Sequence, residues 1–339
     1  MTTQSDTGTT GPHLISVVIP VYAGERTLPV LVKEILSMAA EFRTAGGHLA
    51  RVTEVVLVYD HGPDRSAWVI RELAGEYAAV RTVWLSRNYG QHAATLAGMA
   101  SAGGEWIVTM DEDGQHDPAD IPALLDRAMD AQVGVVYARP VNGRPHGWFR
   151  NVTSAASKRL IDLLVSEGNA TAYHSYRLML GEVGRGVAAY AGAGVYLDVA
   201  LGWVAGEAAT CPVTLRPEGS RPSGYRLRTL LSHFWRLVLT SGTRLLRVVA
   251  VVGGLFALLG LAFAVFLVVN KLVGGEIQPG WTSVMVVALV GTGAIMLTLG
   301  IVAEYLGVAV DMAMGKPLYL ISADPQAGPL GRRPSREGA

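Results

Sequence analysis

Short apolar runs alternate with amphipathic segments along the first part of the chain. Apolar, β-branched runs are typical of buried strands, and they lie at Leu14–Val21, Val52–Val58, Val80–Leu85, Glu105–Met110 and Val133–Tyr137. Segments in which apolar residues recur at helical spacing lie at Thr27–Ala40, Ser66–Tyr77, Gln91–Ala102, Ile121–Ala131 and Trp148–Leu164. Strands and helices that alternate in this way predict an α/β domain on a parallel sheet with right-handed crossovers.

Two long uncharged runs follow this region, at Val248–Val269 and Thr282–Ala303. A helix needs about 20 residues to cross a hydrocarbon core of about 30 Å. Helices that are apolar on every face are more typical of membrane spans than of surface helices. We therefore predict transmembrane helices over residues 248–270 and 282–303. The alternative is a pair of core helices in a large soluble domain.

Basic residues flank the two runs and are sparse between them. Arginines precede the first run at Arg226, Arg228, Arg236, Arg244 and Arg247. Basic residues follow the second run at Lys316, Arg332 and Arg333. The positive-inside rule therefore predicts a multi-pass protein of the cell (inner) membrane, with the large domain before the first run and both termini in the cytoplasm.

Arginines and leucines interleave just before the first run, over residues 223–247. This pattern predicts an amphipathic helix at the membrane surface, although an ordinary surface helix packed on the domain would show it too. The resulting organisation is a disordered tail over residues 1–12, an α/β domain over 13–222, the interfacial helix, the two spans, and a cytoplasmic segment over 304–339.

Composition agrees with a membrane protein. Half of the residues are hydrophobic, 17% are charged and the mean hydropathy is +0.32, which is unusual for a soluble domain. Basic and acidic residues balance at 28 each, so nothing indicates nucleic-acid binding through a net positive field. Cys211 is the single cysteine, which excludes an intramolecular disulfide and fits a reducing compartment. The polar N-terminus shows no signal peptide.

Polar loops follow three of the predicted strands, at Tyr22–Glu25, Asp60–Asp64 and Asp111–Asp117. In an α/β sheet the ligand lies beyond the carboxyl ends of the strands, so we expect the three loops on one edge. In an extended segment Asp111 and Asp113 would leave the same face. With the Gln115 amide they supply the oxygen ligands that Mg²⁺ or Mn²⁺ prefers. A solvated acidic turn is the alternative.

Other polar residues are weaker candidates. Asp60 could accept hydrogen bonds from a nucleobase or ribose, or could stabilise its own turn. Arginines suited to binding phosphate are Arg139, Arg177, Arg216 and Arg221. Asp198 is a further carboxylate with either a site role or a structural one, and we expect a structural role for His116.

Four stretches resemble the family 2 glycosyltransferases. They are "SVVIPVYAGERTL" (16–28), "LSRNYGQHAATLAGMASAGGEWIVTMDEDGQHDP" (85–118), "SGYRLRTLL" (223–231) and "EYLGVAVDMAMGKPLYLI" (304–321). The resemblance is to the polyprenyl-phosphate branch, similar to dolichol-phosphate mannose synthase and bacterial undecaprenyl-phosphate sugar transferases. It implies a GT-A type (Rossmann-like) fold. It also implies inverting transfer of a sugar from a UDP- or GDP-linked donor to a membrane polyprenyl phosphate.

The resemblance also assigns roles to individual positions. The residues assigned to nucleotide binding are Pro20, Tyr22, Glu25, Asp60, Asp111 and Glu112. The residues assigned to a Mg²⁺ or Mn²⁺ ion are Asp111, Asp113 and Gln115. It implies catalytic roles for Asp113, Arg139, Arg177 and Arg221, and an acceptor loop that contains Ser223 and Tyr225. Arg139 and Arg177 match arginines that handle the diphosphate or the acceptor phosphate.

The chain departs from the family pattern at several positions. Ala23 and Gly24 stand where the family usually has Asn and Glu, and Tyr59 stands where it has Asp. The loop arginine is displaced, so either Arg216 or Arg221 could fill its role. These departures keep open a degenerate, membrane-anchored sugar-nucleotide binder, or a transferase with a different lipid or glycan acceptor.

The chemistry of such a transfer needs few catalytic groups. A lipid phosphate is already an anionic nucleophile, so the enzyme must mainly position it and stabilise the charge on the departing diphosphate. A processive polymer synthase is disfavoured because the chain has only two predicted spans and no Gln-x-x-Arg-Trp segment. The sugar is not identified by any motif, and small residues over Gly291–Gly300 leave a homo-oligomer open.

Overall fold

The computed structural model describes residues 11–142, 174–192, 197–217, 280–315 and 317–328, together with scattered residues between 253 and 273. The chain divides into two compact units. One comprises residues 1–152, 171–225 and 317–339, and the other comprises residues 153–170 and 226–316. Several predicted features lie outside the described residues: the helix over 148–164, the interfacial helix over 223–247, and most of the first span and of the terminal tails.

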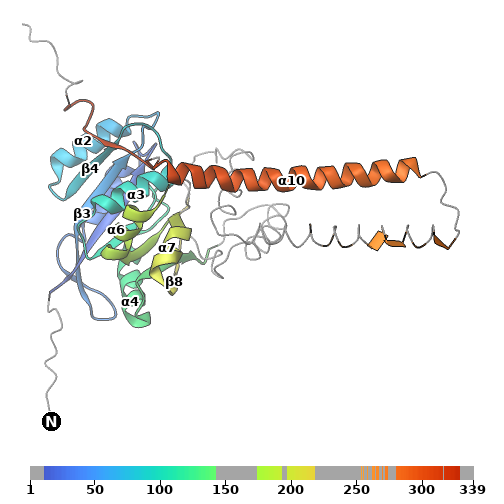
Figure 1. Cartoon of the computed structure of the whole chain (residues 1–339). Coiled ribbons are helices and arrows are strands. Elements are labelled where there is room, and N and C mark those ends of the chain that lie inside the picture. The colour runs from blue at the N-terminus through green and yellow to red at the C-terminus, as the bar shows by residue number, and fades with distance from the viewer. Residues whose placement is uncertain are drawn as a thin grey trace, which may run out of the picture. The chain divides into compact units, whose positions relative to one another are not determined.

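The first unit is built on a mixed sheet of nine strands (Figure 1). The strands are β1 (His13–Val21), β2 (Phe42–Arg43), β3 (Leu49–Tyr59), β4 (Val80–Leu85), β5 (Trp106–Thr109), β6 (Val135–Pro140), β7 (Arg177–Leu180), β8 (Ala208–Val213) and β9 (Ile321–Ser322). Their order is β8-β6-β7-β5-β1-β3-β4-β9, and β2 pairs with β3. The α/β prediction is therefore confirmed.

The expectation of a parallel sheet holds for only part of it. β5, β1, β3 and β4 are parallel neighbours, as the alternation of strands and helices predicts. β7 is antiparallel to both β5 and β6 and lies between them. This four-residue strand begins with an arginine and is too short to show a periodic pattern, so the sequence did not reveal it.

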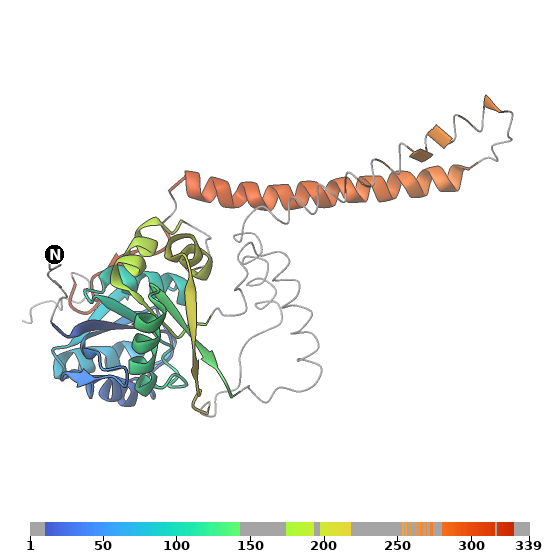
Figure 2. The ribbon, with the colours of Figure 1, turned by 90° about the horizontal axis from the view of Figure 1, so that it is seen from below.

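Helices cover both faces of the sheet (Figure 2). They are α1 (Leu28–Leu36), α2 (Ser66–Glu76), α3 (Gln91–Ser101), α4 (Ile121–Ala131), α6 (Gly181–Tyr190) and α7 (Leu197–Ala205), and a short 3-10 helix (Pro118–Asp120) precedes α4. Successive strand residues point to opposite faces, so Val17 and Val18 enter two different cores. Apolar residues of α1, α2 and α4 belong to the first core, and residues of α3, α6 and α7 belong to the second.

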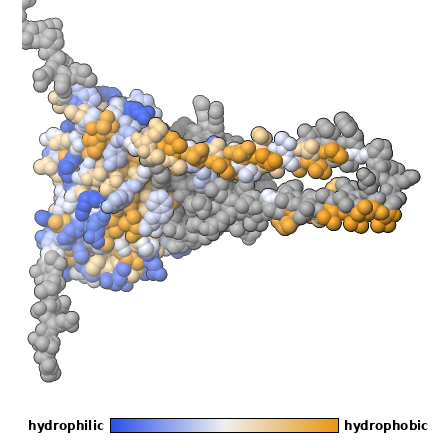
Figure 3. All heavy atoms as spheres, in the orientation of Figure 1, coloured by the Kyte–Doolittle hydropathy of each residue, from blue (hydrophilic) through white to orange (hydrophobic). Residues whose placement is uncertain are grey.

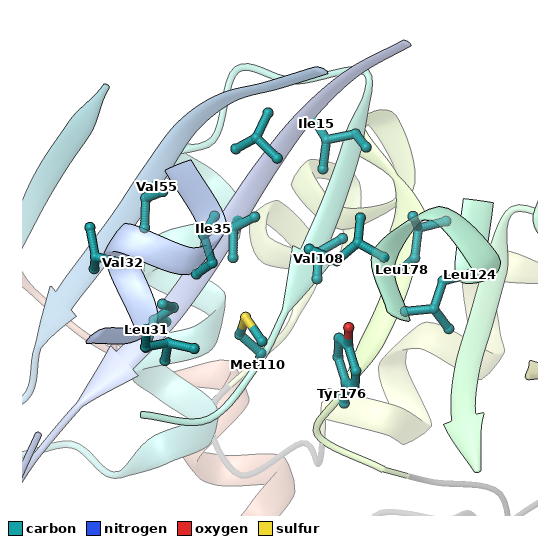
Figure 4. Packing of buried hydrophobic residues seen from close by; sticks show 14 of the residues in the cluster. Ile15, Leu31, Val32, Ile35, Val55, Val108, Met110, Leu124, Tyr176 and Leu178 are labelled. Atoms are coloured by element: carbon teal, nitrogen blue, oxygen red, sulfur yellow. The ribbon is translucent and has the colours of Figure 1, made fainter. Parts of the chain in front are cut away.

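Close packing fixes the helices against the strands. In the first core Leu31, Val32 and Ile35 of α1 gather near Val55 of the sheet (Figure 4). In the second core a Cβ at Gly98 of α3 would lie 2.3 Å from Val18 Cγ1. Because such a contact is impossible, α3 can approach the sheet this closely only with glycine at that position. The carboxyl ends of the strands are thus held on a rigid scaffold.

A single long helix, α10 (Trp281–Ala313), makes up most of the described part of the second unit. Within it, Val290–Val310 has a mean hydropathy of 1.9 and is long and apolar enough to cross a membrane, and 6% of this stretch is buried. Its exposed apolar surface is orange in Figure 3. The predicted second span over 282–303 falls within α10, which continues ten residues further.

The segment that follows α10 in sequence completes the sheet of the first unit. β9 pairs antiparallel with β4, with Ile321 opposite Leu85 and Ser322 opposite Trp84. The backbone N–H of Ser86 donates to Leu320 O at 2.9 Å. Asp324 accepts two hydrogen bonds of 2.6 Å from the Arg71 guanidinium of α2. Part of the predicted C-terminal segment is therefore a component of the catalytic domain.

Candidate active site

The carboxyl ends of four parallel strands share one edge of the sheet. The register places Val21 opposite Tyr59 and Tyr59 opposite Trp84, while Val18 is opposite Thr109. The loops that follow β1, β3, β4 and β5 therefore begin side by side. The three polar loops that the sequence predicts to share an edge do so.

Asp111 follows β5 and is surrounded by hydrogen-bond donors. Its Oδ1 accepts from the Gln91 side-chain amide at 2.5 Å, and its Oδ2 accepts from the Ser175 hydroxyl at 2.7 Å. Burial raises the pKa of Asp111, and the hydrogen bond from Ser175 opposes this shift. The carboxylate is thus held in one orientation, and a positive charge brought next to it would stabilise its ionised form.

The backbone beyond Asp111 is held by His116. The Asp111 N–H donates to His116 Nδ1 at 3.0 Å, and the buried imidazole stacks on Tyr176 with ring centroids 4.8 Å apart. The Tyr176 hydroxyl donates to the carbonyl of Asp117 at 2.8 Å. This agrees with the structural role expected for His116.

Asp113 and Gln115 have different surroundings. Asp113 is partly exposed, and its Oδ1 accepts from the Gln115 N–H at 3.0 Å in a tight turn with Gly114 at φ +76°. Gln115 is 5% exposed, and its carbonyl accepts from the Arg216 N–H. Among the described residues no three His, Cys, Asp or Glu side chains are arranged to hold a metal ion. A divalent cation here would need further oxygen ligands from the substrate.

Glu112 binds the protein backbone. Its carboxylate accepts from the N–H groups of Tyr22 and Ala23, with distances of 2.8, 2.8 and 3.1 Å. The family resemblance assigns Glu112 to the nucleotide, which stays a prediction, and the structure shows its carboxylate bound to the loop after β1. Tyr22, with a side chain that is 48% exposed, lies in that same loop, and Pro20 is buried in β1.

Asp60 also turns toward backbone donors. Its side chain is 3% exposed, Oδ1 accepts from the Tyr89 N–H at 2.7 Å, and Oδ2 accepts from the Gly90 N–H at 2.8 Å. Burial raises the pKa of Asp60, and these two hydrogen bonds oppose the rise. Asp60 therefore stabilises the turn after β4 and not its own turn, as the alternative role had it, and its contact with a nucleoside stays a prediction.

Glu25 and Asp64 connect the loops after β1 and β3. The Glu25 N–H donates to Asp64 Oδ2, and the Arg65 N–H donates to Glu25 Oε2, both at 3.1 Å. The Ser66 hydroxyl donates to Asp64 Oδ1 at 2.6 Å and accepts from the Gly24 N–H at 2.8 Å. Each loop thus supplies hydrogen-bond acceptors to the other.

Arg177 lies in the interior. Its guanidinium forms an ion pair with Asp198 of α7, and both side chains are buried. Arg177 Nε also donates to Thr109 Oγ1 at 3.2 Å. The expected contact of Arg177 with a phosphate would require this buried pair to open, so the structure favours a structural role for both residues.

The other candidate arginines differ in their surroundings. Arg216 donates to Glu34 at 2.6 Å and to Asp117 at 2.8 Å, so its guanidinium is already engaged by two carboxylates. Arg139 is exposed at the end of β6. Both β5 and β6 are antiparallel to β7, which places Arg139 on the same edge as Asp111. Arg221, Ser223 and Tyr225 lie outside the described residues.

Comparison with known proteins identifies the family. Residues 16–183 match the model for glycosyl transferase family 2. The chain is 32% identical, over 93% of its length and 91% of the relative's, to undecaprenyl-phosphate 4-deoxy-4-formamido-L-arabinose transferase of Pseudomonas paraeruginosa (strain DSM 24068 / PA7). The chain belongs to the family 2 glycosyltransferases.

Two further matches were found for this glycosyltransferase. The transferase of the same name from Edwardsiella ictaluri (strain 93-146) is 30% identical over 91% of this chain and 93% of that protein. A crystal structure of glucosyl-3-phosphoglycerate synthase from Mycobacterium tuberculosis, in complex with Mn²⁺ and UDP-glucose, is 20% identical. It covers 68% of this chain and 79% of that chain, with a TM-score of 0.47.

Some residues that organise the glycosyltransferase site were not anticipated. Gln91 and Asn88 both lie in the "NYGQ" stretch after β4; Asn88 donates to Asp60 O at 3.0 Å, and Gln91 donates to Asp111. Both residues could have been found from the sequence, because they lie in a stretch that resembles the family. Ser175 belongs to a part of the chain without a recognisable motif, so its bond to Asp111 was visible only in the fold.

Proposed function

We propose that the protein transfers a sugar from a nucleotide sugar to a polyprenyl phosphate. The observation that carries this proposal is the extent of the similarity. Relatives named as undecaprenyl-phosphate transferases align over 93% of the chain, which includes the apolar C-terminal part as well as the catalytic domain. The polar edge of the sheet, with Asp111 and Asp113, supports a site for the donor.

Mg²⁺ or Mn²⁺ is the proposed cofactor. The fit rests on the donor set, because Asp111 and Asp113 present carboxylate oxygens that hard divalent cations prefer. The substrate diphosphate would supply the oxygens that the described residues do not. Such an ion stabilises negative charge on a departing diphosphate. Gln115 is the weaker candidate ligand, since its side chain is buried.

The protein's own residues then bind and orient the substrates. The exposed Tyr22 ring is suited to stacking against a nucleobase. Arg139, exposed on the same edge as Asp111, is suited to pairing with a phosphate. Arg221 is the preferred loop arginine, because Arg216 is engaged by Glu34 and Asp117. Direct attack of the lipid phosphate on the anomeric carbon would invert its configuration.

The acceptor requires contact with a bilayer. α10 supports one membrane span by length and composition, and we propose a second over residues 248–270 together with an interfacial helix over 223–247. Ser223 and Tyr225 would lie in the loop that meets the lipid phosphate. The catalytic domain and both termini would face the cytoplasm, as the positive-inside rule indicates.

The test is transfer by the purified full-length protein in undecaprenyl-phosphate liposomes. UDP- and GDP-linked labelled sugars are supplied with Mg²⁺ or Mn²⁺, and the donor set includes 4-deoxy-4-formamido-L-arabinose because the relatives carry that name. Label in an organic-extractable lipid supports the proposal. Nucleotide binding without a lipid product from any donor would indicate the degenerate binder, and label on a glycan would indicate another acceptor.

The Asp113→Ala variant tests the assignment of the cation site. We expect loss of transfer by a factor of about 100 or more, the range seen when a charge-stabilising group is removed from an active site, with unchanged insertion into liposomes. Asp130→Ala, an exposed carboxylate on α4, is the matched control. Retention of normal activity by Asp113→Ala would remove Asp113 from the cation site.

A further inference from the structure

Glu112 connects two loops that the proposed function assigns to different parts of the donor. It lies between Asp111 and Asp113, and its carboxylate accepts hydrogen bonds from the consecutive N–H groups of Tyr22 and Ala23. β1 ends at Val21, so these two N–H groups lie beyond its last strand residue. Hydrogen bonds to a carboxylate are shorter and stronger than neutral ones, so Glu112 holds the loop after β1 against the loop after β5.

Gly24 provides the space that this arrangement needs. A Cβ at position 24 would lie 2.9 Å from Glu112 Oε2 and 2.8 Å from Leu28 Cγ. Real Cβ atoms essentially never approach other atoms this closely, so a side chain at this position would have to displace a neighbour. Leu28 is fully buried in the first core. The carboxylate of Glu112, the far end of a flexible side chain, is therefore the group that moves most easily, and Leu28 must shift as well.

The backbone of Gly24 has little freedom to move away. Its N–H donates to the Ser66 hydroxyl at 2.8 Å. Its carbonyl accepts from the N–H groups of Thr27 and Leu28, at 3.1 and 3.0 Å, where α1 begins. Because both sides of the residue are hydrogen-bonded, a side chain at position 24 would compete directly with Glu112.

We propose that Glu112 is a positioning residue whose carboxylate, accommodated by Gly24, clamps the loop of Tyr22 to the loop of Asp111 and Asp113. The inference rests on the proposed function, because it assigns the first loop to the nucleobase and the second to the diphosphate and its cation. The clamp sets the distance between these two subsites. Glu112 thus acts on the nucleotide through the backbone and does not contact it.

The clamp is first measured without any ligand, by hydrogen exchange in the full-length protein. Glu112→Ala and Gly24→Ala should both lose protection at the amides of Tyr22 and Ala23, whereas Glu41→Ala, an exposed control after α1, should not. Glu112→Gln keeps one acceptor oxygen and should lose less protection. This variant replaces Glu112→Ala in the experiment if Glu112→Ala does not fold. Unchanged protection in every variant would overturn the proposal.

The positioning role is measured by binding of UDP and GDP in the presence of Mn²⁺, and of Mn²⁺ alone. Loss of a residue that orients ligands typically weakens binding about 10- to 100-fold, and we expect this for Glu112→Ala and Gly24→Ala. With a donor that is turned over, KM should rise while kcat at saturation stays nearly constant, the signature of lost uniform binding. Lost amide protection with unchanged affinities would overturn the positioning role.

A double-mutant cycle separates a clamp from a direct contact. Gly24→Ala and Glu112→Ala disrupt the same arrangement, so the double variant should be no weaker than the poorer single variant. The exchange Gly24→Glu with Glu112→Ala places a carboxylate on the loop that already carries the Tyr22 and Ala23 N–H groups, so it leaves the two loops unlinked and should not regain the affinity. Additive single effects, or recovery of the affinity in this exchange, would contradict the clamp.

These readouts distinguish the two proposals. Absence of a lipid product from the unaltered protein would contradict the proposed function. Hydrogen exchange and Mn²⁺ binding would still decide whether the clamp exists and whether it orders the cation loop.

Discussion

The interior beneath β7 and the carboxyl edge of the sheet both bury a carboxylate, but they stabilise it differently. Asp198 is paired with the guanidinium of Arg177 on a neighbouring strand. Asp60 is paired with the backbone N–H groups of Tyr89 and Gly90. The first arrangement depends on side chains, those of Arg177 and Tyr137, whereas the second depends on the conformation of a turn. Carboxylates that bind backbone donors therefore shape the site loops, and the side-chain pair holds the scaffold beneath them.

The largest effect on stability is expected from Arg177→Met. The substitution leaves Asp198 buried without its cation, and removing one partner of a buried ion pair costs about 3–5 kcal/mol. We expect a loss of this size in the free energy of unfolding, measured by chemical denaturation in detergent with tryptophan fluorescence. The double variant Arg177→Met with Asp198→Leu should recover most of it. A loss below about 1 kcal/mol would show that the pair is solvated.

The next effect is expected at the carboxyl edge. Asp60→Ala leaves the N–H groups of Tyr89 and Gly90 without their acceptor, which costs about 1–3 kcal/mol for buried donors. Faster hydrogen exchange should be confined to the turn that contains Asn88 and to Gln91. Because Gln91 binds Asp111, affinity for Mn²⁺ should fall as well. Normal exchange at these amides would show that the turn keeps its conformation without the Asp60 carboxylate.

The smallest effect is expected where the ion pair is partly exposed. Asp324→Asn weakens the pair with Arg71 and should destabilise the protein by about 0.5–1 kcal/mol, with faster exchange at Ile321 and Ser322. Glu72→Gln, exposed on the same helix as Arg71, is the control. An equal effect of both variants would show that the pair contributes nothing specific.

The same pair predicts a dependence on pH. The hydrogen bond from Arg71 holds the pKa of Asp324 below its ordinary value. A carboxyl group with a lowered pKa contributes its full stability above the pKa of the unfolded chain and loses it as the pH falls through the lowered value. The difference between the unaltered protein and Asp324→Asn should therefore be constant near neutral pH and shrink on acidification. A difference in unfolding free energy that grows on acidification would contradict the assignment of a lowered pKa to Asp324.

Much of the scaffold could be predicted because the spacing of apolar residues indicates which face of a strand or helix is buried. Apolar runs identified β1, β3, β4 and β5 and the helices between them, and parallel neighbours necessarily place their following loops on one edge. Pairing order is a tertiary property, so the insertion of β7 between β5 and β6 was not visible. The two residues of β9 are too few to form a pattern.

The candidate site could be located from the sequence, but the direction of its side chains could not. Consecutive carboxylates at Asp111, Glu112 and Asp113 look alike in a sequence, and only the fold shows that Glu112 turns to the backbone. Arg177 was chosen for its charge, which also suits a buried partner. Asp198 was noted as a candidate carboxylate, and its nearness to Arg177 depends on how α7 packs.

The pairing of β9 with β4 has a consequence for how the protein is made. Trp84 and Ser322 lie 238 positions apart in the sequence. At about 5–20 residues per second, the ribosome needs on the order of 10 to 50 s to pass from one to the other. Throughout that interval the edge of β4 at Trp84 and Leu85 lacks its β9 partner, and unpaired strand edges are where sheets join other chains. This part of the sheet edge is therefore covered only after the C-terminal segment has been made.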